Sequence, residues 1–239
     1  MTTMSETITI ASRYNGPPGS GNGGYSAGIL AVSTDFTSPV VQLRAPPPLD
    51  TALDLVSVDG GFEARLGDQL VMAVEPSAPL PEPPIAPDPS VAIKGRDHFV
   101  SAEDHAFPSC FVCGPHRAEG DGLRIFTGPL SGFDGVGDIW TPDESLADAD
   151  GIVLPEIIWS ALDCPGAFAV GFSEAPMVLA QITAEIYDRP RAGEALTVIG
   201  WEKYHDGRKH GAGTAIYRAD GQCLAQSNQL WIELKPKTA

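Results

Sequence analysis

The sequence predicts an α+β fold in which a long antiparallel sheet wraps around a central helix, and it predicts this unit twice. In both parts of the chain a single helical segment is followed by strands with tight turns between them. The further alternation of strands and helices that a parallel sheet requires does not appear. A proline-rich stretch separates the two parts, so we expect two similar units that form a pseudo-dimer within one chain.

The N-terminal unit is expected over residues 1–75. It opens with a strand at about residues 6–14 and a glycine-rich loop, followed by a short helix at about residues 23–34 that is rich in small and apolar residues. Val- and Leu-rich segments separated by Asp-Gly and Gly-Asp turns then predict four strands. These strands are expected at residues 40–45, 53–60, 61–67 and 69–75.

Residues 76–89 contain seven prolines in fourteen positions. Proline has no N–H group and fixes φ, so this stretch can form neither a helix nor an interior strand and favours an extended polyproline II conformation. We therefore expect a linker over residues 76–99, before a C-terminal unit that spans residues 100–239.

The C-terminal unit is expected to contain one helix over residues 154–170, because Ile157 and Leu162 belong to a broad apolar face. Pro155 suits the first turn of this helix, and Pro165 should end or kink it. Strands are expected at residues 122–126, 135–141, 179–188, 194–206, 211–220 and 222–234.

Charge and composition exclude several classes of function. The chain has 239 residues, with 15 Lys and Arg against 31 Asp and Glu, which gives a net charge of −16. Binding to nucleic acid or to a membrane surface requires a basic patch, so we expect neither partner. No apolar run approaches the ~20 residues that span a bilayer, and no signal peptide is evident. Four cysteines without a signal peptide predict a cytoplasmic protein.

Gly19, Gly21 and Gly24 form the pattern G-x-G-x-x-G, which is typical of dinucleotide-binding loops. The surrounding sequence contradicts that interpretation, because Asn15–Pro18 separate the strand from the glycines and the next strand ends in Arg44 instead of an acid. A flexible surface loop is one alternative. The other is an anion site, because the free N–H groups at a helix start attract negative charge.

One helix wrapped by a long antiparallel sheet, with Gly-Gly at the helix start, resembles the hot-dog fold of acyl-CoA thioesterases and dehydratases. Two such units in one chain resemble the double hot-dog thioesterases. The segment "NGGYSAGILA" (22–31) is similar to the His-Gly-Gly helix of phenylacetyl-CoA-type thioesterases, with Asn22 in the place of the histidine. The segment "YRADGQCLAQSNQLWI" (217–232) is similar to the last hairpin of medium-chain acyl-CoA thioesterases, with Gln229 at the place of a water-holding glutamine.

The resemblance implies that active sites lie between the two units, with the glycine turn from one helix and an acid from the other. When Asn22 is aligned with Leu154, the acidic position is Ala31 in the first helix and Asp163 in the second. One competent site is therefore implied, in which Asn22, Gly23 and Gly24 meet Asp163. The complementary site at Leu154 lacks both the glycines and the acid.

Thioester hydrolysis requires a polarised carbonyl group and an activated water molecule. The resemblance assigns the first task to the backbone N–H of Gly23 or Gly24, assisted by Asn22. It assigns activation of the water to Asp163, and Gln229 would hold that water. These residues also have structural interpretations: Asn22 as an N-cap, Asp163 as a residue that pairs locally, and Gln229 as an ordinary strand residue.

The expected function is hydrolysis of acyl-CoA or a related acyl thioester, and the alternative is a non-catalytic protein of the same fold that binds such ligands. CoA carries phosphates, so cationic side chains are expected at the entrance of the site. We expect no cofactor, and the pseudo-dimers can associate further as homodimers. The candidate phosphate ligands are Arg44, Arg189, Arg191, Arg208 and Lys209.

A cysteine-containing segment at residues 105–121 stands apart from these motifs. Cys110, Cys113 and His116 have the C-x2-C-x2-H spacing of half a zinc site, which His105 or Cys164 could complete. Zinc ribbons normally show a second cysteine pair, which this chain lacks. The favoured expectation is a tight turn whose cysteines pack as small hydrophobic residues, without a metal.

Overall fold

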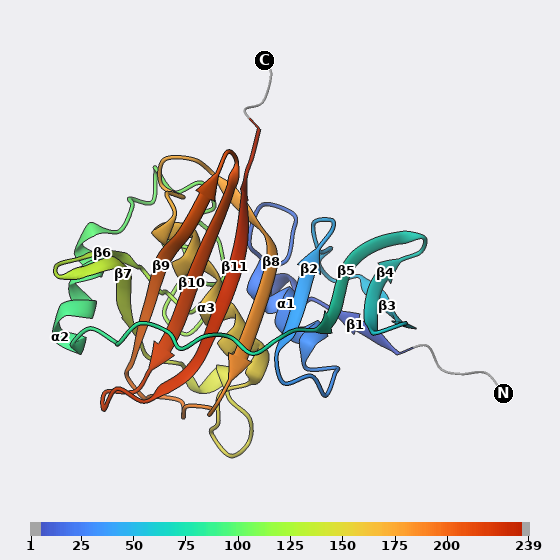
Figure 1. Ribbon diagram of the computed structural model, residues 1–239, viewed down its shortest axis with the longest axis horizontal. Helices are drawn as coiled ribbons and strands as arrows, with labels where there is room; N and C mark the ends of the chain where they lie inside the picture. The colour runs from blue at the N-terminus through green and yellow to red at the C-terminus, as the bar shows by residue number, and fades with distance from the viewer. Residues whose placement is uncertain (1–5, 236–239) are drawn as a thin grey trace.

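The computed structural model describes residues 6–235, which form one continuous sheet with helices on one face (Figure 1). Within these residues the eleven strands follow the order β1-β3-β4-β5-β2-β8-β11-β10-β9-β7-β6. The strands of each ladder pair in the antiparallel sense. Helices α1 (Gly23–Ala31) and α3 (Pro155–Ala169) lie behind the strands in the view of Figure 1. The prediction of an antiparallel sheet with few helices is confirmed.

Apart from the short strand Gly128–Leu130, which was not predicted, each strand overlaps a segment that turn residues and β-branched side chains predict. Before the proline-rich stretch they are β1 (Thr7–Thr9), β2 (Pro39–Leu43), β3 (Ala52–Val58), β4 (Gly61–Leu66) and β5 (Gln69–Pro76). After it they are β6 (Gly128–Leu130), β7 (Phe133–Trp140), β8 (Met177–Ile186), β9 (Leu196–Asp206), β10 (Lys209–Tyr217) and β11 (Cys223–Glu233).

The first strand is shorter than the expected range of residues 6–14. It ends at Thr9, and the chain then turns through a short 3-10 helix, η1 (Ser12–Tyr14). The ring of Tyr14 stacks on the ring of Tyr25 in α1, with the two centroids 3.8 Å apart. This stacking draws the chain away from the sheet and toward the start of α1.

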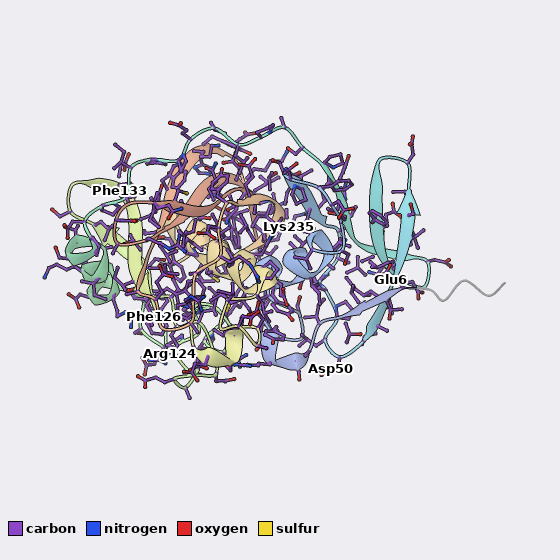
Figure 2. All side chains as sticks on the ribbon, turned by 90° about the horizontal axis from the view of Figure 1, so that it is seen from below. Glu6, Asp50, Arg124, Phe126, Phe133 and Lys235 are labelled. Carbon is purple, nitrogen blue, oxygen red and sulfur yellow. The ribbon has the colours of Figure 1, made fainter. Side chains whose placement is uncertain are left out.

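The strand expected at residues 122–126 is wrong. The N–H groups of Leu123 and Ile125 donate to carbonyls of the cysteine-containing segment at 2.9 and 3.0 Å, so these residues pair with that segment and not with the sheet. Arg124 has a φ of 54°, outside the extended region. Its guanidinium lies 5.1 Å from the centroid of the Phe126 ring (Figure 2).

The two parts of the chain share one sheet because β2 pairs with β8. The register sets Val41 opposite Ile182 and Gln42 opposite Gln181. Val41 and Ile182 are fully buried, so the core continues across this junction. The chain elements of both parts therefore enclose the same interior.

The proline-rich stretch is extended, as predicted, but it lies on the sheet. Residues 77–88 cross the outer face of β8, β11, β10 and β9 (Figure 1). The N–H of Leu80 donates to Glu185 Oε1 at 2.9 Å, and the Tyr217 hydroxyl donates to the Pro84 carbonyl at 2.5 Å. The chain continues in two unexpected short helices, α2 (Pro89–Ala92) and η2 (Ile93–His98).

Helix α3 continues through Pro165 to Ala169, although a proline inside a helix removes one hydrogen-bond donor. Side chains from the sheet support this part of the helix. The Leu162 carbonyl accepts hydrogen bonds from Thr214 Oγ1 at 2.8 Å and from Gln229 Nε2 at 2.5 Å. Within the described residues, no helix has both the length and the apolar character that crossing a lipid bilayer requires.

Helices α1 and α3 approach each other at two glycines of α1. Gly24 and Gly28 are one helical turn apart and therefore share a face. A Cβ atom at Gly24 would lie 2.5 Å from the Trp159 carbonyl oxygen, and one at Gly28 would lie 2.7 Å from Trp159 Cβ. The absence of side chains allows this approach, which brings the middle of α3 to the start of α1.

We expect Gly28→Ala to lower the free energy of unfolding by about 1–3 kcal/mol, the usual effect of overpacking. The reason is the steric conflict with Trp159 Cβ at 2.7 Å and with Glu156 Cα at 2.9 Å. The intrinsic helix propensity of alanine exceeds that of glycine by about 1 kcal/mol, which by itself would stabilise α1. A net loss of stability therefore reports the steric conflict between the two helices. Urea denaturation measures the change.

Val32→Ala at the exposed end of α1 is the control, and its effect should stay within about 0.5 kcal/mol. A Gly28→Ala variant as stable as the native chain would contradict the close contact.

Candidate active site

A cavity of about 460 Å³ lies beside the start of α1 and the middle of α3, with walls that also come from β2, β8 and β11. This volume is within the range of about 300–1,000 Å³ that is usual for small-molecule sites. Most of the wall is apolar. The side chains that make it so include Leu43, Phe107, Phe168, Phe172, Met177 and Leu179.

Asp163 connects α3 to the start of α1 within this cavity. Its Oδ2 accepts hydrogen bonds from Asn22 Nδ2 at 2.6 Å and from the Gly24 N–H at 3.0 Å. Its Oδ1 is buried and has no hydrogen-bond partner among the described residues. Buried polar atoms usually have a partner, and because Asp163 lines the cavity, a water molecule or a ligand group there can supply one.

The environment of Asp163 favours its protonated form. Burial raises the pKa of its carboxyl group to about 7, because removal from water destabilises the carboxylate. The hydrogen bonds from Gly24 and Asn22 act in the opposite direction, while negative charge on Cys110 raises this pKa further. A carboxyl group with such a pKa can accept and release a proton near neutral pH.

Asn22 has two roles at once. Its Oδ1 accepts a hydrogen bond from the Tyr25 N–H at 2.9 Å, which confirms the N-cap interpretation. Its Nδ2 donates to Asp163. The cap of α1 therefore fixes the side chain that holds the acid of α3.

Of the two amides expected to polarise a carbonyl group, only the N–H of Gly23 remains available. The Gly24 N–H is occupied by Asp163. The Gly23 N–H makes no hydrogen bond within residues 6–235, and Gly23 lines the cavity. As the first residue of α1, Gly23 also lies at the positive end of the helix dipole.

Gln229 lies outside the cavity, in contrast to the water-holding position expected for it. Its Nε2 donates to the Leu162 carbonyl and to Ser227 Oγ, and its Oε1 accepts from Trp231 Nε1 at 2.7 Å. These contacts occupy the amide and attach β11 to α3. Gln229 supports the helix that carries Asp163.

The structure brings one of the expected cationic residues to the cavity wall. Arg44 lines the cavity. Arg208 donates to the Glu233 carbonyl at 2.9 Å, and the next residue, Leu234, lines the cavity as well. Among the described residues, Arg44 is therefore the basic residue that lines the cavity, whereas Arg208 binds the chain segment next to it and is not part of the wall.

Arg189 and Arg191 are engaged elsewhere. Arg189 pairs with Asp148 at 3.4 Å, and Arg191 donates to the Asp150 carbonyl at 3.1 Å. Neither residue lines the cavity. Both lie between β8 and β9 and bind the loop that precedes α3, a contact that sequence spacing alone did not reveal.

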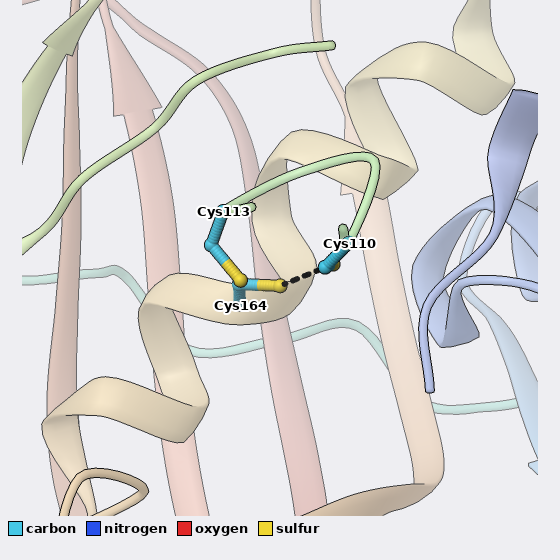
Figure 3. A group of neighbouring side chains, drawn as sticks. All are labelled: Cys110, Cys113 and Cys164. Carbon is cyan, nitrogen blue, oxygen red and sulfur yellow. Dashed lines mark hydrogen bonds between the residues drawn. The ribbon is translucent and has the colours of Figure 1, made fainter. Parts of the chain in front are cut away.

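Three cysteines meet at the cavity wall: Cys110, Cys113 and Cys164. All three are free thiols, and Cys110 Sγ lies 3.7 Å from Cys164 Sγ (Figure 3). Hydrogen bonds from Cys113 and Cys164 hold the pKa of Cys110 well below its usual value, whereas burial raises the pKa of the other two thiols. Cys164, which the sequence offered together with His105 to complete the set, joins Cys110 and Cys113, whereas His116 is not part of this group.

The sequence did not single out the aromatic wall of the cavity. The ring centroids of Phe168 and Phe172 are 5.2 Å apart, and those of Phe107 and Phe172 are 5.5 Å apart. Phe168 belongs to α3 and Phe172 follows the end of this helix. The wall arises from tertiary packing, since Phe107 comes from a different loop.

No protein-family model matches the sequence, and no curated protein matches it. Several solved structures share its architecture. A tesB protein from Mycobacterium avium subspecies paratuberculosis is 11% identical, with 96% of this chain and 92% of that chain covered and a TM-score of 0.60. A candidate thioesterase from Novosphingobium aromaticivorans is 14% identical, with coverages of 96% and 95% and a TM-score of 0.61. A hot-dog protein of unknown function from Alicyclobacillus acidocaldarius is 13% identical, with coverages of 99% and 95% and a TM-score of 0.57.

We expect Asp163→Asn to stabilise the chain at about pH 8 and to have less effect at lower pH. The folded state binds the Asp163 proton more tightly than the unfolded state, because its pKa is raised from 3.8 to about 7. Native stability therefore falls as the pH rises through this interval, and the neutral amide removes that loss. Thermal unfolding of both proteins across this pH range measures the difference.

Groups far from Asp163 titrate in the same way in the native and Asp163→Asn proteins, so their contributions cancel in the stability difference. A stability difference that does not change with pH would contradict the raised pKa.

Proposed function

We propose that this chain, which has the hot-dog fold, hydrolyses acyl thioesters of the acyl-CoA type. The observation that carries the proposal is the buried contact of Asp163 with Asn22 and Gly24 beside an apolar cavity. This contact places a carboxyl group that can gain or lose a proton near neutral pH next to the positive end of the helix dipole. Activation of water and polarisation of a carbonyl group are the two requirements of the reaction.

In this proposal the thioester carbonyl oxygen accepts a hydrogen bond from the Gly23 N–H. The dipole of α1 adds to the stabilisation of the negative charge that develops on this oxygen. One such donor typically contributes about 10²–10³ to the rate. The fit is supported by the position of Gly23, whose N–H makes no other hydrogen bond within the described residues.

Asp163 activates the attacking water through Oδ1. The carboxylate takes a proton from the water, whose oxygen forms a bond with the carbonyl carbon. The tetrahedral intermediate then collapses, the carbon–sulfur bond breaks, and the proton on Asp163 passes to the leaving thiolate. The products are a carboxylic acid and a thiol, and Asp163 returns to its starting state.

The cavity favours an apolar acyl group, since its aromatic wall is made by Phe107, Phe168 and Phe172. The chain carries a net charge of −16, so the phosphates of CoA require local cations. Arg44 and Arg208 are the residues that we propose for this task. The other cationic residues that the sequence analysis named are not part of this proposal.

We also propose that residues 1–75 and 100–239 are two hot-dog halves joined by residues 76–99. Two observations support this arrangement: β2 pairs with β8 at the centre of the sheet, and the aligned residues Asn22 and Leu154 are both N-caps. The second helix start begins with a proline, which has no N–H to donate, and Ala31 stands at the acidic position. One competent site per chain follows from this asymmetry.

We expect Asp163→Asn to lower kcat/KM for acyl-CoA substrates by about 10²–10⁴, the usual range for loss of general acid–base catalysis. The amide can still accept from Gly24 but cannot take a proton from water. Release of the free thiol from a panel of aliphatic and aromatic acyl-CoAs, followed with a thiol reagent, measures the rate. The exposed Asp134→Asn is the matched control and should retain native activity.

A native protein that turns over no member of the panel, yet binds one of them, would establish the non-catalytic alternative. Equal activity of the native and Asp163→Asn proteins would remove Asp163 from the mechanism.

A further inference from the structure

The three cysteines at the cavity wall have the spacing of metal ligands. Their sulfur atoms all lie within 4.8 Å of one another and converge from a loop and from α3 (Figure 3). A tetrahedral zinc site has zinc–sulfur bonds of about 2.3 Å, which separates two ligand sulfurs by about 3.8 Å. The sulfurs of Cys110 and Cys164 are 3.7 Å apart. We infer that Cys110, Cys113 and Cys164 bind a soft metal ion of the Zn²⁺ type.

The loop is shaped to present two of these sulfurs. The Gly114 N–H donates to the Cys110 carbonyl at 2.9 Å, and a Cβ atom at position 114 would lie 2.4 Å from that oxygen. Only glycine can therefore close this turn. The third sulfur, from Cys164, is fixed by a rigid helix.

The donor set selects the kind of metal. Three thiols attract soft or borderline ions such as Zn²⁺ and disfavour Mg²⁺ and Ca²⁺, which prefer oxygen ligands. All three cysteines line the cavity, so an ion can reach them through it and the cavity has room for a fourth ligand. Three protein ligands with one open position are typical of zinc sites that hold a water molecule or a substrate group.

Asn22 links this cluster to Asp163. Its Nδ2 lies 3.9 Å from Cys110 Sγ and 2.6 Å from Asp163 Oδ2. Such contacts around the ligands orient them and adjust their basicity. Asp163 lines the same cavity, and its Oδ1 has no hydrogen-bond partner among the described residues.

The metal site does not depend on thioester hydrolysis, and its test does not use activity. The full chain, reduced and treated with a chelator, is titrated with Co²⁺ and then with Zn²⁺. We expect one equivalent of Co²⁺ to give a thiolate-to-cobalt charge-transfer band in the near ultraviolet, and Zn²⁺ to abolish it. Zn²⁺ should also raise the melting temperature, because binding to the folded state stabilises it.

Cys110→Ser and Cys164→Ser should weaken binding by more than about 100-fold, the loss that changes around the ligands already produce. Cys223→Ser is the matched control, since Cys223 is the one cysteine outside the cluster, and it should bind as the native chain does. Equal binding by Cys110→Ser would overturn the inference, as would a native chain that gives no charge-transfer band.

X-ray absorption at the zinc edge of the native chain provides a test that needs no variant. Three sulfur ligands at about 2.3 Å are expected. A shell made only of nitrogen and oxygen would assign the ion to the second group of ligand side chains, His205, His210 and Glu233, and would overturn the inference.

Discussion

The contact between the backbones of α1 and α3 determines where every proposed functional group lies. It exists because Gly24 and Gly28 carry no side chains on the face that meets Trp159. Gly24 contributes a second time, since its N–H holds the Asp163 carboxylate. A larger residue at position 24 would therefore separate the helices and also displace the acid from the N-terminal end of α1, so that packing and chemistry depend on the same atoms.

The position of Asp163 has an electrostatic cost. An apolar cavity raises its pKa to about 7, and one of its oxygens has no partner among the described residues. Proteins usually avoid such a group in the core, and strongly shifted carboxyl groups cluster where proton transfer is needed. The neighbouring cysteine cluster lines the same cavity. Asn22 contacts both Asp163 and Cys110, so the acid and the thiols form one connected polar group in a mostly apolar wall.

Local sequence patterns predicted helices and strands well where neighbouring residues alone determine the backbone conformation. Turn residues and β-branched runs located the antiparallel strands, and the resemblance of residues 22–31 placed Asn22 at the start of a helix facing Asp163. Patterns failed where a partner distant in sequence decides the outcome. Residues 122–126 have strand-like composition but pair with the cysteine segment, and Gln229 is drawn to the Leu162 carbonyl, 67 residues away. For the cysteines the sequence left His105 and Cys164 open as partners, and the fold brings Cys164 to Cys110, 54 residues away.

The pH dependence of kcat/KM tests most directly whether the buried carboxyl group is the catalytic base. Asp163 must be ionised to accept a proton from water, so the rate should rise with pH and level off above its pKa of about 7. The apparent pKa belongs to the free enzyme and should not depend on the acyl group of the substrate. A profile that is already level at about pH 5, as an ordinary exposed carboxylate would give, would contradict the role of Asp163.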